Sequence, residues 1–299
     1  MQSKNIAYLY TGLTILFWAG AASAFKSALA LISPIELLCA STLLSLLVLS
    51  LLLTRSGKLA GLGTLSLRHW LYLLTLGAIN PFLYYVILFQ AYDLLPGQVA
   101  MSLNYLWPVM LAILSVPILH HSLSLISMIA ILLSFSGAVI IASGGSFNDW
   151  GGLNPAGIAL ALVSTLVWAV YWLLNARLRI DAEIKLFVGF MAGTALSWGY
   201  ALGSDQFSFE WTRYPWLSVA YVGIFEMGIT FFIWLRALQL APNAARIGNL
   251  IYLTPFLSLS FLALLLGETI QLSTLAGLLV IISGILLQQY AGRRQRIHA

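Results

Sequence analysis

The feature that most constrains this chain is a hydrophobic pattern of five segments that occurs twice. The residues that punctuate the segments return at offsets of 146 to 150 residues. The returning pairs are Trp18-Ala19 with Trp168-Ala169, Ala91 with Ala237, Pro96 with Pro242, Tyr105-Leu106-Trp107-Pro108 with Tyr252-Leu253-Thr254-Pro255, and Ser136-Gly137 with Ser283-Gly284. Five membrane crossings end on the opposite side from their start, so a second set of five must be inverted. The pattern therefore predicts the inverted-repeat architecture of secondary transporters.

Composition supports a membrane location. Hydrophobic residues make up 61% of the chain, charged residues 8%, and the mean hydropathy is +0.96, whereas a soluble domain carries about 25% charged residues. Ten apolar runs are long enough to cross a hydrocarbon layer of about 30 Å. They span residues 6–25, 34–53, 70–91, 97–118, 124–143, 155–175, 184–203, 215–237, 244–266 and 272–290. The sequence predicts an all-α polytopic membrane protein, with ten transmembrane helices arranged as two inverted five-helix repeats around a central substrate cavity.

A polar break at 143–155 divides the two halves. Its glycines and its Asn and Asp residues are typical of a turn-rich loop. The first repeat is predicted at 1–147 and the second at 148–299, within one membrane domain. Asn154-Pro155 is expected to begin the helix after the break, because proline is tolerated in a first helical turn.

Basic residues predict the orientation. In the ten-helix arrangement, 12 of the 14 Lys and Arg residues lie in loops or helix ends on one side, and only Lys26 and Arg213 lie on the other. The positive-inside rule therefore places both termini in the cytoplasm. The first apolar run is longer than the core of a signal peptide, so we expect it to remain as a helix.

Motifs for catalysis or metal binding are missing from the sequence. It has no G-x-x-x-x-G-K-[ST] and no H-E-x-x-H, and Cys39 is its only cysteine. Adjacent residues on a helix point about 100° apart, so His120-His121 is interpreted as a solvated pair. Asp93 has no second intramembrane Asp for an aspartyl-protease site. We therefore predict no enzymatic activity, catalytic residue, metal, cofactor, nucleic-acid partner or obligate protein partner.

Three tryptophans, Trp18, Trp107 and Trp168, lie deep inside their apolar runs. An indole N–H at that depth has no water unless a cavity supplies it. Around Trp168 the spacing i, i+3, i+4, i+7 places four polar or aromatic residues on one face of a helix. They are Trp168, Tyr171, Trp172 and Asn175.

Amides and aromatic residues share helix faces in three further pairs. They are Asn80 with Tyr84, Asn104 with Trp107, and Asn249 with Tyr252. Each residue taken singly could equally serve to pack helices together. Taken as a set, they favour a shared polar and aromatic cavity.

Glu226 is the acid that cannot reach a membrane surface, because it falls in the middle of the run at 215–237. A charge at that depth costs about 2.5–3.5 kcal/mol, so intramembrane acids are paired, neutral or exposed to water. Three roles remain open for it. It can bind a substrate ammonium group, exchange a coupling proton, or act as a protonated structural hydrogen bonder.

Pro81, Pro108 and Pro255 fall inside apolar runs. A proline within a helix removes a backbone hydrogen bond and frees the carbonyl four residues earlier. Freed carbonyls in a membrane need partners or a wet cavity, so these prolines are predicted hinges facing the bundle interior. Simple bends that serve packing are the alternative.

The residues also resemble a known family over essentially the whole chain. The duplicated unit, the two Ala-x4-Pro turns, Gly267-Glu268 and the final Ser283-Gly284 resemble the drug/metabolite transporter superfamily, in its ten-helix EamA-like branch. The string Asn104-Tyr105-Leu106-Trp107-Pro108, with Trp18 and Trp168, is similar to the aromatic amino-acid exporters of the bacterial inner membrane.

This resemblance implies export of amino acids by alternating access, with small-molecule substrates and membrane lipid as the partners. It implies that Trp18, Tyr84 or Tyr85, Trp107 and Trp168 line the cavity; helical spacing does not decide between the two tyrosines. Aromatic walls attract an ammonium group by about 0.5–2 kcal/mol but discriminate weakly between similar side chains. A broad range of neutral amino acids is therefore expected. Efflux of cationic drugs, using the same cavity and Glu226, is the alternative.

Overall fold

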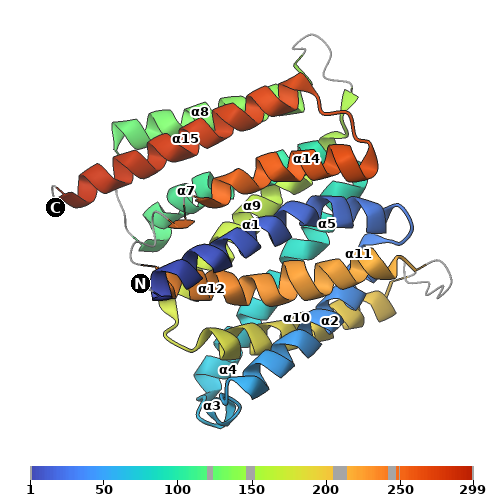
Figure 1. Cartoon of the computed structure of the whole chain (residues 1–299), viewed down its shortest axis with the longest axis vertical. Coiled ribbons are helices and arrows are strands. Elements are labelled where there is room, and N and C mark those ends of the chain that lie inside the picture. The colour runs from blue at the N-terminus through green and yellow to red at the C-terminus, as the bar shows by residue number, and fades with distance from the viewer. Residues whose placement is uncertain are drawn as a thin grey trace. The chain divides into compact units, whose positions relative to one another are not determined.

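The computed structural model describes residues 2–119, 124–145, 152–204, 214–241, 247–248 and 250–297 (Figure 1). Every regular element within these ranges is helical. The chain forms two compact units, Met1–Phe89 with Leu178–Gly267 (unit 1) and Gln90–Arg177 with Glu268–Ala299 (unit 2). Each unit contains helices from both predicted repeats, and the repeats at 1–147 and 148–299 remain a prediction.

Unit 1 begins with two long helices and contains several broken ones. Its elements are α1 (Gln2–Leu29), α2 (Pro34–Arg55), α3 (Ala60–Gly63), α4 (Leu67–Gly77), η1 (Ala78–Leu83), most of α5 (Tyr84–Leu94), α10 (Ala182–Leu202), α11 (Trp216–Ala220), η4 (Tyr221–Ile229), α12 (Thr230–Leu240), η5 (Ile251–Leu253) and α14 (Thr254–Leu266). Here η1 and η4 are π-helical and η5 is a 3₁₀-helix.

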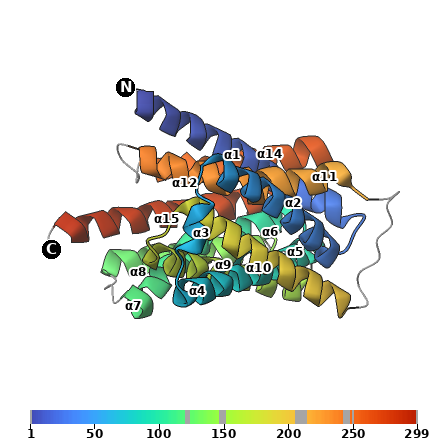
Figure 2. The same cartoon turned by 90° about the horizontal axis from the view of Figure 1, so that it is seen from below.

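Two groups of contacts organise unit 1. Helix α1 lies beside α12 and α14, and α2 lies beside α10 and η4 (Figures 1 and 2). Glycine permits the close approach of η4 to α2, because a Cβ at Gly223 would come within 2.8 Å of the Ser41 carbonyl oxygen. The Ser45 hydroxyl then donates a hydrogen bond of 2.7 Å to the Gly223 carbonyl. These contacts with α2, within unit 1, thus fix the position of η4.

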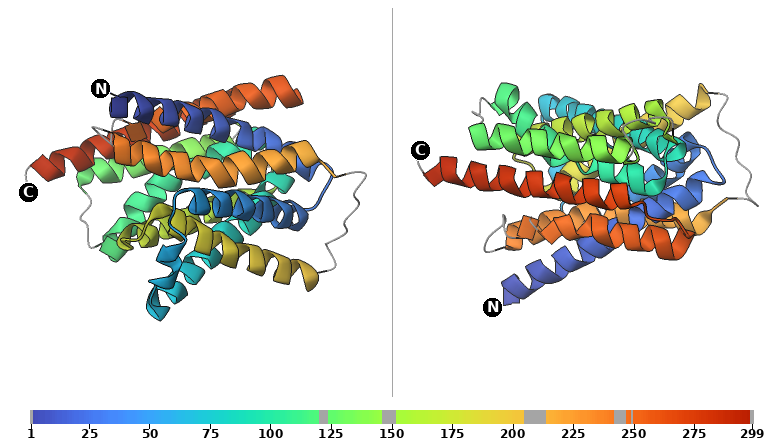
Figure 3. Two further views of the ribbon diagram at one scale, coloured as in Figure 1. Left: turned by 60° about the horizontal axis from the view of Figure 1, so that its bottom comes forward. Right: turned by 90° about the horizontal axis from the view of Figure 1, so that it is seen from above.

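Unit 2 contains the end of α5 and five further helices. They are α6 (Gly97–Asn104), α7 (Trp107–Leu119), α8 (Leu125–Ala142), α9 (Pro155–Arg177) and α15 (Leu272–Ile297). Helices α8 and α15 run side by side (Figure 3, right). They meet at glycines, since a Cβ at Gly137 would lie 2.5 Å from the Gly277 carbonyl oxygen. Small residues of this kind let helix backbones approach closely in a membrane.

Polar residues define several helix ends. Ser33 and Glu36 form a capping box at the start of α2, with Pro34 in the first turn, which satisfies backbone donors that the helix leaves free. The Asn154 side chain accepts hydrogen bonds from the backbone of Ala156 and Gly157. This confirms the predicted helix start at Asn154-Pro155. At the end of α14, Gly267 adopts a φ of 67°, which glycine tolerates without strain.

Three of the predicted continuous helices are interrupted. Helix α4 passes into η1, where Asn80 has non-helical angles (φ −145°, ψ 122°) and the Asn80-Pro81 peptide bond is cis. Residues 105–106 form a turn between α6 and α7, so Pro108 lies in the first turn of α7. Pro255 likewise lies in the first turn of α14. Pro108 and Pro255 thus each follow a local irregularity within the helical spans Gly97–Ile118 and Ile251–Leu266, where a missing N–H is tolerated, and their role as hinges remains a prediction.

Eight helices of the described chain are long and apolar enough to cross a membrane. They cover Asn5–Leu29, Pro34–Arg55, Leu67–Leu94, Gly97–Ile118, Leu125–Ala142, Pro155–Arg177, Trp216–Leu240 and Leu272–Ala291. The runs predicted at 184–203 and 244–266 correspond to α10, of 21 residues, and to the shorter apolar helix Ile251–Leu266. The described structure is thus an all-helical polytopic membrane protein, and the count of ten remains a prediction.

Candidate functional site

Glu226 and Tyr85 form a buried polar contact in unit 1. The Tyr85 hydroxyl lies 2.8 Å and 2.9 Å from the two carboxylate oxygens of Glu226. Tyr85 is fully buried and Glu226 is 8% exposed. Tyr84 packs its ring against Tyr85, with centroids 4.8 Å apart. The structure thus gives Tyr85 the contact with the acid. A hydrogen bond from a phenol to a carboxylate is charge-assisted, and is stronger than one between neutral groups.

The backbone around Glu226 is unusual. The acid lies within the π-helical segment η4, and Thr230 donates its hydroxyl hydrogen to the Phe225 carbonyl. π-Helical turns are rare in proteins overall, but those that do occur are frequently found at functional sites. Asn80 lies in the other long π-helical segment, η1. The offset of 146 that relates Ala91 to Ala237 also relates Asn80 to Glu226. An amide and an acid therefore occupy matching positions of the predicted repeats, both in π-helical segments of apolar helices.

Asn80 is a buried polar residue of unit 1 without a hydrogen-bond partner among the described residues. It is 2% exposed, and neither its Nδ2 nor its Oδ1 atom has a partner in the part of the chain that the structure describes. Leaving a buried polar group without a partner costs about 1–3 kcal/mol. A buried polar group without a partner therefore needs an explanation, and one explanation is that the amide binds a ligand.

Aromatic rings fill much of the space near these helices. The Trp18 ring packs against Phe231 and Trp234 of α12, with centroids 6.0 Å and 5.9 Å away. Tyr85 packs on Phe89 at 5.2 Å. Tyr252 is buried in η5, at the start of the α14 segment. Trp18, Tyr84, Tyr85, Glu226 and Tyr252 all belong to unit 1, as do Asn80, Pro81 and Pro255.

Unit 2 carries a second polar and aromatic group along α9. The rings of Trp168, Tyr171 and Trp172 have centroids 5.6 to 6.0 Å apart. Asn175 donates its amide hydrogen to the Tyr171 hydroxyl at 3.1 Å. The prediction that these four residues share one helix face is confirmed.

Asn104, at the end of α6, joins this group through a residue that the sequence analysis missed. Its amide donates a hydrogen bond of 2.9 Å to the Ser164 hydroxyl of α9. Ser164 precedes Trp168 by four residues, so helical spacing alone places it on the same face. The turn at 105–106 lies between Asn104 and Trp107, and the face that they were expected to share remains a prediction.

The candidate residues divide between the units. Asn104, Trp107, Pro108, Trp168, Tyr171 and Trp172 lie in unit 2. Asn249 lies outside the described residues. A single cavity shared by the whole set therefore remains a prediction.

Polar groups buried inside apolar helices are characteristic of proteins that move solutes across membranes. A sequence model of the EamA-like transporter family matches residues 5–143 and again residues 155–288. The chain therefore belongs to the EamA-like transporter family, which confirms the resemblance.

Individual relatives cover most of the chain. The uncharacterized transporter YvbV of Bacillus subtilis is 24% identical over 99% of this chain and 95% of its own. The aromatic amino acid exporter YddG of Ancylobacter novellus is 26% identical over 86% of this chain and 88% of its own. One crystal structure aligns with 98% of this chain and 99% of its own, at a TM-score of 0.69 and 22% identity. That structural likeness concerns the fold alone.

Proposed function

We propose that this protein exports amino acids across a bacterial inner membrane as a secondary transporter, with aromatic and other neutral amino acids among its substrates. It works by alternating access between two inverted five-helix repeats, with both termini in the cytoplasm. The observation that carries this proposal is the buried contact between Glu226 and Tyr85, inside a helix that is otherwise apolar. The distant similarity to an aromatic amino acid exporter supports the substrate class.

The chemistry of an amino acid suits the groups that the two units present. A carboxylate such as Glu226 attracts the ammonium group, and the Asn80 amide offers both a donor and an acceptor. Aromatic rings such as Trp18 and Trp168 provide apolar walls and attract cations by about 0.5–2 kcal/mol each. Because aromatic walls distinguish single methylenes by only about 1–3 kcal/mol, the substrate range is broad.

The test is uptake into proteoliposomes preloaded with unlabelled amino acid. Labelled phenylalanine, tryptophan and threonine are offered, with and without a pH gradient. Saturable uptake that these three compete for supports the proposal, and its absence under both conditions contradicts it. Uptake that needs the gradient and disappears in Glu226→Gln would identify proton exchange at this acid. The exposed acid Asp93 provides a matched control, and Asp93→Asn is expected to transport normally.

Efflux of cationic drugs is the second candidate. It is favoured by the burial of Glu226, for which no ion pair is found within the described part of the chain. Glu226→Gln should abolish transport of a cation, because the carboxylate is then the main counter-charge. It should only weaken transport of a zwitterion that is also held by its carboxylate and side chain. Measuring a lipophilic cation and phenylalanine side by side in this variant separates the two functions.

A further inference from the structure

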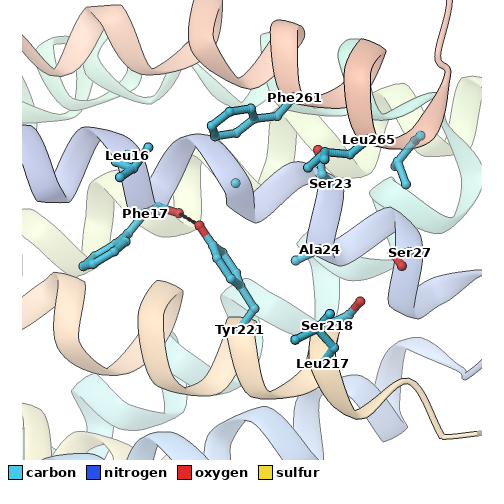
Figure 4. Close-up of a pocket in the computed structure, with 12 residues that line it drawn as sticks. Leu16, Phe17, Ser23, Ala24, Ser27, Leu217, Ser218, Tyr221, Phe261 and Leu265 are labelled. Atoms are coloured by element: carbon cyan, nitrogen blue, oxygen red, sulfur yellow. Dashed lines mark hydrogen bonds between the residues drawn. The ribbon is translucent and has the colours of Figure 1, made fainter.

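A cavity of about 450 Å³ lies along α1 in unit 1 (Figure 4). Helix α14 forms one flank, and α11 with the start of η4 forms the other. Its size falls within the 300–1,000 Å³ common for pockets that hold small molecules. None of the candidate substrate residues above lines it.

The cavity has a length and a polarity that match one leaflet of a membrane. Along α1 its lining extends from Leu16 to Ser27, which is about 16 Å at 1.5 Å per residue. That is roughly half of a hydrocarbon layer of about 30 Å. Ser27 and Ser218 lie at the end that the basic residues predict to be outermost, whereas Leu16 and Phe261 line the deeper end.

The deep end of the cavity is closed by a tyrosine. The Tyr221 hydroxyl donates a hydrogen bond of 2.8 Å to the Phe17 carbonyl (Figure 4). Glycine at position 20 makes this possible, because any Cβ there would collide with the Tyr221 ring. By contrast, the rim is open, since Leu217 is 88% exposed and Leu265 is 67% exposed. In a membrane, exposed leucines at this depth face lipid.

One buried polar group beside the cavity has no partner among the described residues. Ser23 lines the cavity and is 4% exposed, and its hydroxyl oxygen, which is shielded in this rotamer, has no hydrogen-bond partner in the part of the chain that the structure describes. Thr11 and Thr14, on the same helix, donate their hydroxyl hydrogens to carbonyls one turn earlier, as hydroxyl side chains within helices commonly do. Because it has no such bond to lose, the Ser23 hydroxyl can rotate about its Cα–Cβ bond to donate to a group in the cavity.

We propose that this cavity binds one acyl chain of an outer-leaflet phospholipid, with Ser23 donating a hydrogen bond to the ester carbonyl. The methylene chain extends toward Leu16 and Phe17, and the ester region lies among the serines. The site is independent of the transported substrate.

The test uses the full-length protein in vesicles that contain a phosphatidylethanolamine with a photoactivatable diazirine midway along one acyl chain. Crosslinked peptides are identified by mass spectrometry. Labelling is expected on α1 and α14 within the cavity lining. Ser23→Ala should reduce it about fivefold, the factor that corresponds to one hydrogen bond of about 1 kcal/mol. Ser218→Phe, which fills the outer end, should reduce it further. Leu264→Phe, on an 80% exposed residue of α14 outside the lining, should leave it unchanged.

Two outcomes would overturn the assignment. Labelling spread evenly over the lipid-facing helices, and unmoved by Ser23→Ala and Ser218→Phe, would show ordinary surface lipid. Displacement of the label by phenylalanine or by tetraphenylphosphonium, at constant lipid content, would make the cavity an entry path for substrate.

Discussion

Glu226 and Tyr85 can be treated as an energetic pair, because one hydroxyl reaches both carboxylate oxygens in a buried environment. Tyr85→Phe removes that hydroxyl and leaves the carboxylate without this donor. We expect the unfolding free energy to fall by about 1–3 kcal/mol, the cost of a buried group that loses its partner. Thermal unfolding in detergent, followed by intrinsic fluorescence, measures the change.

A double-mutant cycle separates pairing from simple loss of volume. Tyr85→Phe and Glu226→Gln should not be additive, with a coupling energy of about 0.5–3 kcal/mol. Tyr84→Phe removes a hydroxyl from the neighbouring residue, whereas the hydrogen bonds to Glu226 found among the described residues come from Tyr85. It should be additive with Glu226→Gln. Equal coupling for both tyrosines would mean that the contact contributes nothing specific.

At the scale of elements, the packing of α8 on α15 depends on glycines, which have no side chain to hold the two helices apart. A Cβ at Gly137 would lie 2.5 Å from the Gly277 carbonyl oxygen, and the backbone there cannot yield cheaply. Gly→Ala within a helix ordinarily stabilises by roughly 0.5–1 kcal/mol. We expect Gly137→Ala to lower the unfolding midpoint in spite of that gain. Gly12→Ala is the control, because nothing lies within 4 Å of its Cβ position. A midpoint that rises in both variants would show that α8 and α15 are not tightly packed.

Four charged residues join the loop after α2 to α10 and α12 at one end of unit 1. Lys58 lies 2.8 Å from Glu183 and 3.3 Å from Asp181, and Arg236 lies 3.1 Å from Glu183. The hydrogen bond to Glu183 raises the pKa of Lys58 above its ordinary value, against the lowering effect of burial. Because the pKa of Lys58 is higher in the folded than in the unfolded protein, its ion pairs stabilise the fold fully at pH values below the unfolded pKa of about 10.4. This stabilisation is lost as pH rises through the folded pKa.

The expected result of Lys58→Met is a lower unfolding midpoint, by about 2–4 °C at pH 7 to 9, the shift that roughly 1 kcal/mol produces. The difference from wild type should begin to shrink above about pH 10.4, where the lysine of the unfolded chain loses its charge, and should disappear as pH rises through the higher folded pKa. Arg55→Met, at the exposed last residue of α2, should change little. A Lys58→Met effect that is constant to high pH would exclude the charge as its cause.

The helices themselves followed from the sequence, because an apolar run of about 20 residues has few alternatives in a membrane. The face shared by Trp168, Tyr171 and Asn175 followed too, since α9 is regular. Regular spacing did not predict the turn between Asn104 and Trp107. It also could not decide between Tyr84 and Tyr85. Helical spacing gives the order of residues around one helix but does not tell which helices are in contact. The hydrogen-bond partner of Glu226 could therefore be identified only from the structure.

The same limit hid the cavity along α1. Ser23 and Gly20 look ordinary in an apolar run. Gly20 acquires a role only because Tyr221, about 200 residues later in the chain, packs against it, and Ser23 because it lines the same cavity. At the scale of the whole molecule, duplication is the stronger guide. The family model matches the chain twice, and the offset that aligns Ala91 with Ala237 brings Asn80 and Glu226 into register. An inverted repeat would then place the amide and the acid on symmetry-related helices.

Orientation provides the decisive prediction at this scale, because the inverted repeat requires each half to cross the membrane five times. Alkaline phosphatase is active outside the cytoplasm and inactive within it. Fusions after residues 147, 209 and 269 should therefore be active, and fusions after residues 180, 243 and 299 inactive. Green fluorescent protein at the same positions should give the opposite pattern. The informative pair is 180 and 209, which flanks α10 with its buried Glu183 near the start. Equal activity at both would mean that α10 does not cross, and the two halves could not then be inverted copies of one another.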